Sequence, residues 1–293
     1  MFAKAYEIAT SFTRPVIVSM RFYDKSVKCS IGAFVVLNDE GWIITAAHLF
    51  EPYFALQQHS RELSAYTKQV VTIEQDQDLT AKQKDKKLRK LIPNPRWITN
   101  VSFWWSWDSV TIKDIKRLPE GDIVVGRLEP FEKTMVKAHP LLKDPSKGLN
   151  PGTSLCKLGY PFHAVTASFD EEKNEFKIAP GVLPLPRFPI EGIFTRNVRT
   201  GQSKDGRYEI KFLETSSPGL RGQSGGPIFD TSGTVWAIQI RTAHFPLGFS
   251  PNVKKNDKEV EEHQFLNVGL GIHPELIVTF LGDNGIAFKL SDH

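Results

Sequence analysis

A serine lies between glycines in segment 222–227, which reads G-Q-S-G-G-P. Extended, β-branched segments flank it, so we expect Ser224 on a tight loop between strands. Glycines there permit unusual backbone dihedrals and let the backbone approach a ligand closely. The N–H groups of Gly222 and Ser224 can then point at one developing negative charge, which is the geometry that acyl transfer needs. A plain Gly-Ser turn is the alternative.

Two other residues supply what a serine nucleophile needs. A serine hydroxyl is a weak nucleophile at neutral pH, so an imidazole must take its proton and a carboxylate must fix the tautomer of that imidazole. His48 ends a predicted strand that closes with T-A-A-H, and Asp122 opens another one after Gly121. His48, Asp122 and Ser224 fill these roles if the two halves of the chain face each other across a cleft.

Competing residues are weaker candidates. Asp108 and Asp114 also precede the predicted strand of Asp122, but both lie among polar or loop residues. The remaining histidines show no metal-ligand spacing such as H-E-x-x-H, so no metal site is expected. These histidines are His59, His139, His163, His244, His263, His273 and His293.

Short strands would position the candidate residues in the first half of the chain. Alternation of apolar residues and the turn N-D-E-G predict strands there, at residues 15–22, 28–37, 41–48 and 122–128. Phe103, Trp105 and Trp107 fall on one face of a further strand, which indicates barrel core or a cover of the barrel mouth.

Segment 51–96 interrupts this pattern with polar sequence, and its residues 82–90 hold five Lys and one Arg. It predicts one or two helices inserted between strands, as a solvated surface feature. A basic docking site for a regulatory protein partner or for nucleic acid is the alternative. Aromatic residues do not interleave the basic ones, which makes nucleic acid the weaker of these two partners.

The second half repeats the strand pattern. Strands are predicted at 153–159, 190–198, 208–213, 233–240 and 268–272. Long loops are expected at 168–189 and 244–264, and a C-terminal helix at 274–281. Because 129–150 is a candidate connection, the chain divides into an N-terminal barrel, 1–140, and a C-terminal barrel, 141–293. Two sets of short strands with few helices indicate an all-β protein of two barrels.

Composition sets further bounds. The 293 residues are 40% hydrophobic and 24% charged, which is the composition of a globular protein. The net charge of +4 is too small to indicate binding to nucleic acid. No apolar run is long enough to cross a membrane. Lys4 and Glu7 break the N-terminal segment, so it does not resemble a signal peptide. Cys29 and Cys156 are the only cysteines; we interpret both as buried thiols in a reducing, cytoplasmic compartment.

Together, the three motifs resemble the trypsin-like (chymotrypsin-fold) serine peptidases. T-A-A-H at His48, G-D-I-V-V around Asp122, G-Q-S-G-G-P around Ser224 and the order His, Asp, Ser are those of the family. The resemblance covers residues 12–283 apart from the insertions. Three fragments are similar to the bacterial HtrA-like branch, here expected without a PDZ domain: L-G-Y-P at 158–161, P-G-L-R-G at 218–222 and G-L-G-I-H-P at 269–274.

The resemblance implies two six-stranded antiparallel β-barrels, here with a helical insertion in the first and a short C-terminal helix. It implies cleavage of protein or peptide substrates through an acyl-enzyme, with no metal or organic cofactor. His48 would act as base and then acid, Asp122 would orient it, and Ser224 would attack. The N–H groups of Gly222 and Ser224 would hold the oxyanion.

One departure concerns activation. Family members that are activated by clipping place an acid directly before the serine, where it pairs with the new N-terminal ammonium. Gln223 stands at that position here. We therefore expect activity from the unprocessed chain, or control by a partner or a conformational switch.

A second departure concerns the substrate pocket. The residue six positions before the serine selects Lys or Arg when it is an acid, and here it is Pro218. Arg221 lies nearby, and three residues match the strand that lines the pocket: Ile240, Arg241 and Thr242. These residues favour apolar or acidic side chains.

Two other classes of protein compete with this interpretation. A catalytically silent β-barrel binding module would keep the fold, but such modules usually lose a catalytic residue. An α/β-hydrolase esterase needs G-x-S-x-G between a strand and a helix, with the serine ahead of the acid and histidine. Ser224 comes last and precedes a strand. The sequence thus favours an intracellular serine endopeptidase, regulated through segment 51–96 or by a conformational switch.

Overall fold

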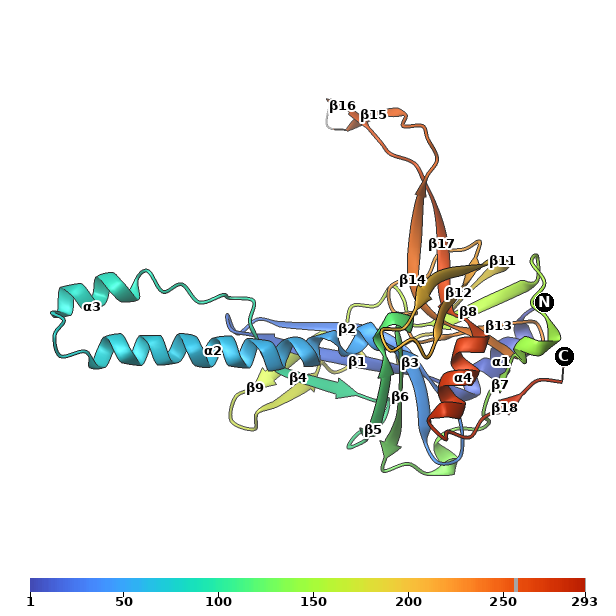
Figure 1. Ribbon diagram of the computed structural model, residues 1–293, viewed down its shortest axis with the longest axis horizontal. Helices are drawn as coiled ribbons and strands as arrows, with labels where there is room; N and C mark the ends of the chain where they lie inside the picture. The colour runs from blue at the N-terminus through green and yellow to red at the C-terminus, as the bar shows by residue number, and fades with distance from the viewer. Residues whose placement is uncertain (256–257, 293) are drawn as a thin grey trace.

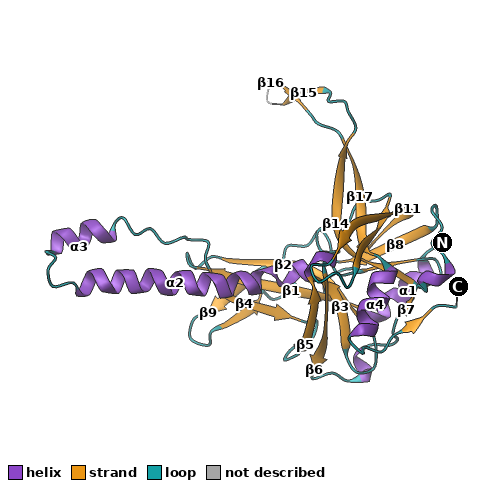
Figure 2. Cartoon of the chain, viewed as in Figure 1, coloured by secondary structure: helices purple, strands orange, loops and turns teal. Residues whose placement is uncertain are grey.

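The computed structural model describes residues 1–255 and 258–292 (Figure 1). Strands make up the body, while a helical arm and a β-ribbon project from it in different directions (Figure 2). Both labelled ends of the chain lie at the side of the body away from the arm. None of the described helices is both long and apolar enough to span a membrane.

The first sheet has six strands in the order β4-β1-β2-β3-β6-β5. Its β-branched and aromatic side chains alternate onto an inner face, where Phe34 and Trp105 are fully buried. Phe103 and Trp107 pack against this core, which confirms the predicted core role of the aromatic cluster. The strand itself ends at Trp104, so Trp105 and Trp107 lie beyond it and not on its face. The strands are β1 (Thr13–Phe22), β2 (Val27–Val36), β3 (Trp42–Ala46), β4 (Ile98–Trp104), β5 (Thr111–Leu118) and β6 (Ile123–Glu129).

The second sheet has eight strands, in the order β13-β8-β11-β12-β17-β14-β7-β18. A further pairing between β13 and β14 closes six of them into a barrel, and the two-residue strands β7 and β18 add to its edge in parallel. Its strands are β7 (Leu141–Leu142), β8 (Ser154–Gly159), β11 (Phe188–Gln202), β12 (Glu209–Thr215), β13 (Pro227–Phe229), β14 (Val235–Pro246), β17 (Phe265–Ile272) and β18 (Lys289–Leu290). The predicted fold of two β-barrels is confirmed.

Two short helices complete the body. The predicted C-terminal helix is α4 (Pro274–Asp283), which buries Leu276 and Phe280. Sequence analysis assigned no element to α1 (Ala3–Phe12), whose Ala5, Ala9 and Phe12 are fully buried. Because α1 contacts β8 and β13 of the second sheet, the chain crosses between the halves more than once. The division at residue 140 stays a prediction.

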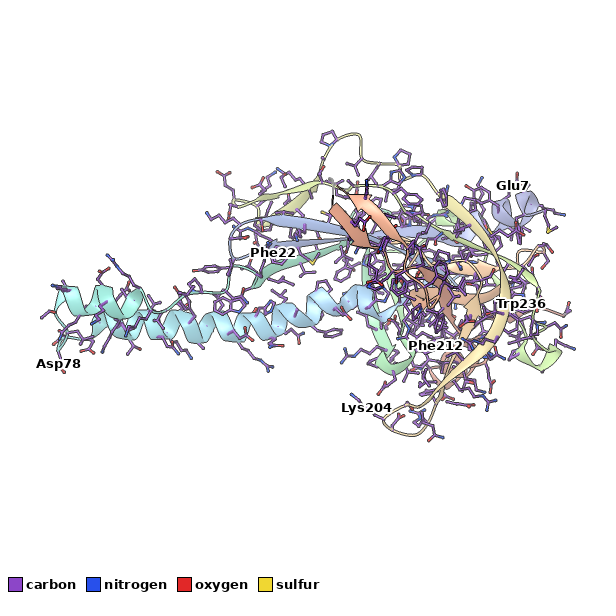
Figure 3. The ribbon with its side chains drawn as sticks, turned by 90° about the horizontal axis from the view of Figure 1, so that it is seen from above. Glu7, Phe22, Asp78, Lys204, Phe212 and Trp236 are labelled. Carbon is purple, nitrogen blue, oxygen red and sulfur yellow. The ribbon has the colours of Figure 1, made fainter. Side chains whose placement is uncertain are left out.

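The predicted helical insertion forms the arm, with α2 (Glu51–Gln75) and α3 (Ala81–Leu88). None of the described residues of either helix is buried, so the arm is a solvated feature. At its base, the Trp97 indole donates to Glu62 (2.6 Å) and the Ile98 N–H donates to His59 Nδ1 (2.8 Å). Asp78, at the turn between the helices, lies furthest from the body (Figure 3).

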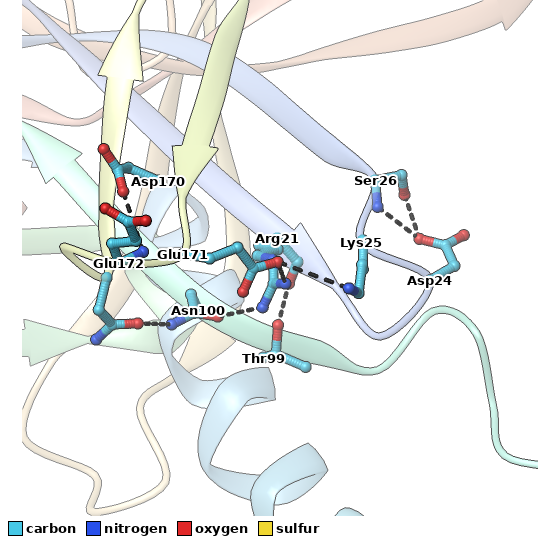
Figure 4. A network of polar contacts seen from close by, with 10 residues as sticks. Arg21, Asp24, Lys25, Ser26, Thr99, Asn100, Asp170, Glu171 and Glu172 are labelled. Atoms are coloured by element: carbon cyan, nitrogen blue, oxygen red, sulfur yellow. Dashed lines mark hydrogen bonds and ion pairs between the residues drawn. The ribbon is translucent and has the colours of Figure 1, made fainter.

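Segment 168–189 is not the open loop that its prolines suggested. It contains a hairpin of β9 (Ala167–Asp170) and β10 (Glu175–Ile178), with Phe169 facing Phe176 across the strands. The turn of this hairpin reaches the first sheet, where the Arg21 guanidinium forms an ion pair with Glu171 (Figure 4). The same guanidinium lies 4.6 Å from the Phe169 ring centroid. The hairpin therefore ties the two halves together.

The prediction of a loop at 244–264 is also partly wrong. Strands β14 and β17 continue beyond the barrel as a paired ribbon as far as Pro246 and Phe265, and β15 (Asn252–Lys255) and β16 (Lys258–Glu261) follow at its end (Figure 1). Residues 256–257 of the predicted loop lie outside the described residues. Cys29 and Cys156 are free thiols; Cys156 is buried as expected, whereas Cys29 is only half-buried.

Candidate active site

His48 and Asp122 come together at one end of the first barrel. His48 lies just past β3 in a short 3₁₀ turn, and Asp122 lies just before β6, the strand that pairs with β3. The Asp122 carboxylate accepts from the His48 backbone N–H through Oδ1 and lies against His48 Nδ1 through Oδ2, each at 2.8 Å. One carboxylate thus fixes both the backbone and the ring, so the proton belongs on Nδ1 and Nε2 is left as an acceptor.

Asp122 has an unusual backbone. Its φ of 54° and ψ of 37° are left-handed, a region that Asp tolerates better than most residues. The conformation follows the turn Pro119–Gly121, whose Pro119 carbonyl accepts from the Asp122 N–H. The Asp122 carbonyl accepts in turn from the Ala47 N–H (3.0 Å). Hydrogen bonds to Pro119 and to Ala47, the neighbour of His48, therefore stabilise the strained backbone conformation of Asp122.

The environment of His48 shifts its pKa upward. Burial alone lowers the pKa, but the hydrogen bond that His48 donates to Asp122, the charge of Asp122 and the charge of Glu51 outweigh burial. The ring is one-third exposed and Asp122 about one-fifth exposed. A base of this kind is neutral only above its raised pKa, so it can accept a proton near and above neutral pH.

Ser224 lies on a loop that both halves of the molecule hold. Its carbonyl accepts from the Ala33 N–H of β2 (2.7 Å), and the next N–H, of Gly225, donates to Gln239 of β14 (2.7 Å). Gly225 has φ +83°, and a Cβ there would meet the Ala33 carbonyl oxygen at 2.0 Å. Only glycine fits this approach of the two barrels.

The Ser224 hydroxyl donates to the Ile240 carbonyl (3.3 Å). No hydrogen bond joins it to His48 in the part of the chain that the structure describes. Both side chains nevertheless line the same open cavity of about 910 Å³. Catalytic hydrogen bonds of this kind often form or tighten only when substrate binds.

Gly222 provides the second candidate oxyanion donor. It has φ +93°, and its carbonyl accepts from the Tyr160 N–H (2.9 Å). That bond holds the 222–223 peptide, whose N–H, on Gln223, donates to the Leu220 carbonyl (2.9 Å). Among residues 1–255 and 258–292, no acceptor is recorded for the N–H groups of Gly222 and Ser224. Two unpaired donors beside a serine hydroxyl are suited to a developing negative charge.

Gln223 braces this loop from within. It is fully buried, its Oε1 accepts from the Leu220 N–H (2.9 Å), and its Nε2 donates to the Phe188 carbonyl (3.3 Å). The acid that clipping-activated members use is thus replaced by a neutral amide that needs no ammonium partner. The amide ties the loop to β11 in the unprocessed chain.

The Gln223→Ala substitution is expected to destabilise the fold by about 2–3 kcal/mol, because it leaves the Leu220 N–H without its buried acceptor. Loosening of the loop is expected to slow fluorophosphonate labelling of Ser224 about tenfold. Urea unfolding and labelling rates measure the two effects. Gln202→Ala, at an exposed position of β11, is the control. An unchanged labelling rate in a stable Gln223→Ala chain contradicts the bracing role.

The predicted substrate-pocket residues surround a second cavity, of about 560 Å³, next to Ser224. Two walls face each other across it, 218–221 on one side and β14 on the other. The Thr242 hydroxyl donates to the Gly219 carbonyl (2.6 Å) and joins the walls. The five residues predicted for the substrate pocket all line this cavity, and their role in binding substrate stays a prediction: Pro218, Arg221, Ile240, Arg241 and Thr242.

Gln239 and Lys157 also support this cavity, although no sequence motif marks them. Gln239 lines it and is buried, and its Oε1 has no partner among the described residues. The Lys157 ammonium contacts the Ser217 carbonyl and hydroxyl and the Pro218 carbonyl behind the wall. Burial lowers the pKa of Lys157 to about 7. A lysine within an apolar strand is the one signal that the sequence offered.

The competing acids lie elsewhere. Asp108 accepts from the Trp104 indole (3.0 Å), and Asp114 forms an ion pair with Arg127 (3.0 Å). Neither contacts His48. Among the described residues, no group of three or more His, Cys, Asp or Glu side chains is arranged to hold a metal ion.

The first barrel carries the His48–Asp122 pair, and Ser224 lies on a glycine-rich loop of the second barrel. The sequence profile of the trypsin-like peptidase domain matches residues 32–238, which is most of the chain. The chain belongs to the trypsin-like peptidase family. No curated protein matches the sequence.

Matches among solved structures are distant. They include the HtrA-type protease AlgW with a tripeptide, at 14% identity and a TM-score of 0.49, covering 97% of this chain and 63% of that one. They also include the active form of the Rv3671c protease from M. tuberculosis, at 12% identity and a TM-score of 0.49, covering 98% of this chain and 86% of that one. The chain therefore spans less than two-thirds of the AlgW chain.

Proposed function

We propose that this protein is a serine endopeptidase that cleaves protein or peptide substrates through an acyl-enzyme. The observation that carries the proposal is the double contact of Asp122 with His48, at 2.8 Å to the backbone N–H and 2.8 Å to Nδ1. This contact leaves His48 Nε2 free to accept a proton in the cavity that Ser224 also lines. Membership of the trypsin-like peptidase family supports the same chemistry.

The proposed reaction follows from these positions. His48 Nε2 takes the hydroxyl proton as Ser224 Oγ attacks the scissile carbonyl carbon, and the Asp122 carboxylate stabilises the resulting imidazolium. The N–H groups of Gly222 and Ser224 bind the oxyanion. His48 then gives its proton to the leaving amine, which breaks the C–N bond. Water, activated by the same imidazole, hydrolyses the ester and restores Ser224.

A fluorophosphonate probe tests the proposal directly, because it phosphonylates only a serine that a neighbouring base activates. We expect the wild-type chain to be labelled and the Ser224→Ala chain to remain unlabelled, as read by intact mass. Ser146→Ala changes an exposed serine of a short 3₁₀ turn and is the control. A folded wild-type chain that does not react would contradict the enzymatic function.

A catalytically silent binding module is the second candidate. The observation that favours it is the Ser224 hydroxyl, which donates to Ile240 rather than to His48. Labelling separates the two candidates, because a module with a misdirected serine reacts no faster than free serine. Labelling that appears only with a second protein would indicate a conformational switch.

We further propose a cytoplasmic location and a regulatory protein partner that binds the arm. The arm buries no described residue of its own, and α3 carries four of the lysines at its far end.

Comparison of new protein N-termini in cells with wild type and with Ser224→Ala would identify substrates. Substrates confined to another compartment would contradict the proposed location.

A further inference from the structure

We propose that the cavity beside Ser224 selects an acidic side chain, Asp or Glu, on the residue that precedes the scissile bond. The inference rests on the proposed function, because it assigns that cavity to the substrate of the same reaction. The cavity is bounded by 218–221 and by β14, both of which adjoin the nucleophile loop.

Cationic groups gather around this cavity without partners of opposite charge. Arg221 and Arg241 both line it and are exposed. In the part of the chain that the structure describes, neither guanidinium forms an ion pair or donates a recorded hydrogen bond. The Arg241 guanidinium lies over the Phe212 ring, 4.8 Å from its centroid, so Arg241 borders both this cavity and the neighbouring one that Phe212 lines. Two unpaired guanidinium groups offer planar donors that match a carboxylate.

The other polar side chains at or behind the cavity wall bring no negative charge to it. His244 lines it, with Nδ1 2.6 Å from Oδ1 of the Asn267 side chain. The Lys157 amino group lies behind the wall against the Pro218 carbonyl (3.2 Å) and has no carboxylate partner among the described residues. None of the residues that line the cavity is Asp or Glu. An acidic substrate side chain would therefore meet the two arginines and no negatively charged residue of the cavity wall.

A neighbouring cavity shows that this charge pattern is local. On the other side of Arg241, the space next to His48 and Asp122 is lined by Arg117 but also by Glu51 and Glu120. The charges there are mixed, and an anionic substrate group would gain little. The excess of positive charge belongs to the cavity between 218–221 and β14.

An apolar side chain fits this cavity less well. Placing one there would remove water from Arg221 and Arg241 without supplying an acceptor, which costs free energy for each group left unpaired. A Lys or Arg side chain would add like-charge repulsion. A carboxylate replaces the lost water with charge-assisted hydrogen bonds, so the site discriminates by charge rather than by size.

The first test compares matched peptides in cleavage. We expect kcat/KM for Glu before the scissile bond to exceed that for the isosteric Gln about tenfold, and Asp to exceed Asn similarly. Arg221→Gln and Arg241→Gln are each expected to reduce the Glu/Gln ratio, and the double variant to bring it close to one. Arg199→Gln, an exposed arginine of β11, removes the same charge away from the cavity and should keep the wild-type ratio. A wild-type ratio of one or less overturns the proposal.

The second test needs no catalysis. Acetylated hexapeptide amides that carry Glu or Gln before the central bond are titrated against the Ser224→Ala chain by fluorescence anisotropy. We expect Glu peptides to bind about fivefold more tightly at low salt, and the difference to shrink as salt screens the guanidinium charges. Equal affinity, or no binding of either peptide, overturns the proposal. A wild-type chain that fluorophosphonate leaves unlabelled contradicts the proposed function alone.

Discussion

Replacement of His48 by alanine is expected to lower kcat by about 10⁶, and replacement of Asp122 by asparagine by about 10⁴. Without the imidazole, Ser224 loses the base that is proposed to take its proton. The asparagine amide would instead present an N–H to His48 Nδ1, which favours the tautomer with its proton on Nε2. That tautomer cannot accept from the serine. Steady-state kinetics on a peptide substrate measure both effects.

The pH dependence gives this prediction a second readout. His48 must be neutral to act, and its pKa is raised because Asp122 and Glu51 outweigh burial. The acidic limb of kcat/KM is therefore expected above the ordinary histidine pKa of about 6.5. Asp122→Asn removes the largest factor that raises the pKa and leaves burial, which lowers it. The residual activity of that variant should have its acidic limb at lower pH.

Two other acids provide matched controls. Asp108→Asn and Asp114→Asn make the same chemical change on carboxylates that contact Trp104 and Arg127 instead of His48. Both variants should keep wild-type activity and the wild-type pH profile. A loss in Asp114→Asn comparable with that in Asp122→Asn would show that the acid has been assigned wrongly. An unshifted acidic limb in Asp122→Asn would contradict the coupling to His48.

The barrels could be predicted from the sequence because their signals are local. Strand β6 is a β-branched run between a turn and charged residues, and β2 to β3 is a hairpin around N-D-E-G. Helix α1 was missed although Ala5, Ala9 and Phe12 recur at helical spacing. Its apolar face consists of only three residues, and strand β1 follows directly at Thr13, so the helical pattern is hard to distinguish from the start of the strand.

The candidate site could be predicted in its residue types but not in its supports. The motifs around His48, Asp122 and Ser224 are each a short continuous stretch of sequence, so each residue could be predicted from its neighbours. The roles of the three residues stay predictions. The contacts of Gln223 with Phe188 and of Lys157 with Ser217 join residues 35 and 60 positions apart. No local pattern encodes such pairs. The orientation of the Ser224 hydroxyl likewise depends on packing rather than on sequence.

Replacement of Gly222 by alanine is expected to lower kcat by about 10²–10³, because it displaces one of the two oxyanion donors. The glycine has φ +93°, and a Cβ would lie 2.4 Å from the Tyr160 carbonyl oxygen, which is backbone and cannot rotate away. The peptide must therefore shift, and the N–H moves with it. Since the donor acts on the developing charge, KM should change far less than kcat.

Gly152→Ala separates this effect from backbone strain. Gly152 has φ +90°, nearly the value of Gly222, but a Cβ there would meet nothing within 4 Å. Both variants carry a similar cost of about 1 kcal/mol for a left-handed alanine, while only Gly222→Ala disturbs the cleft. Gly152→Ala should keep wild-type kcat. If both variants lose activity equally, the loss is one of stability, and Gly222 has no special place in binding the oxyanion. If only Gly222→Ala loses kcat while its unfolding midpoint matches that of Gly152→Ala, the oxyanion donor explains the loss.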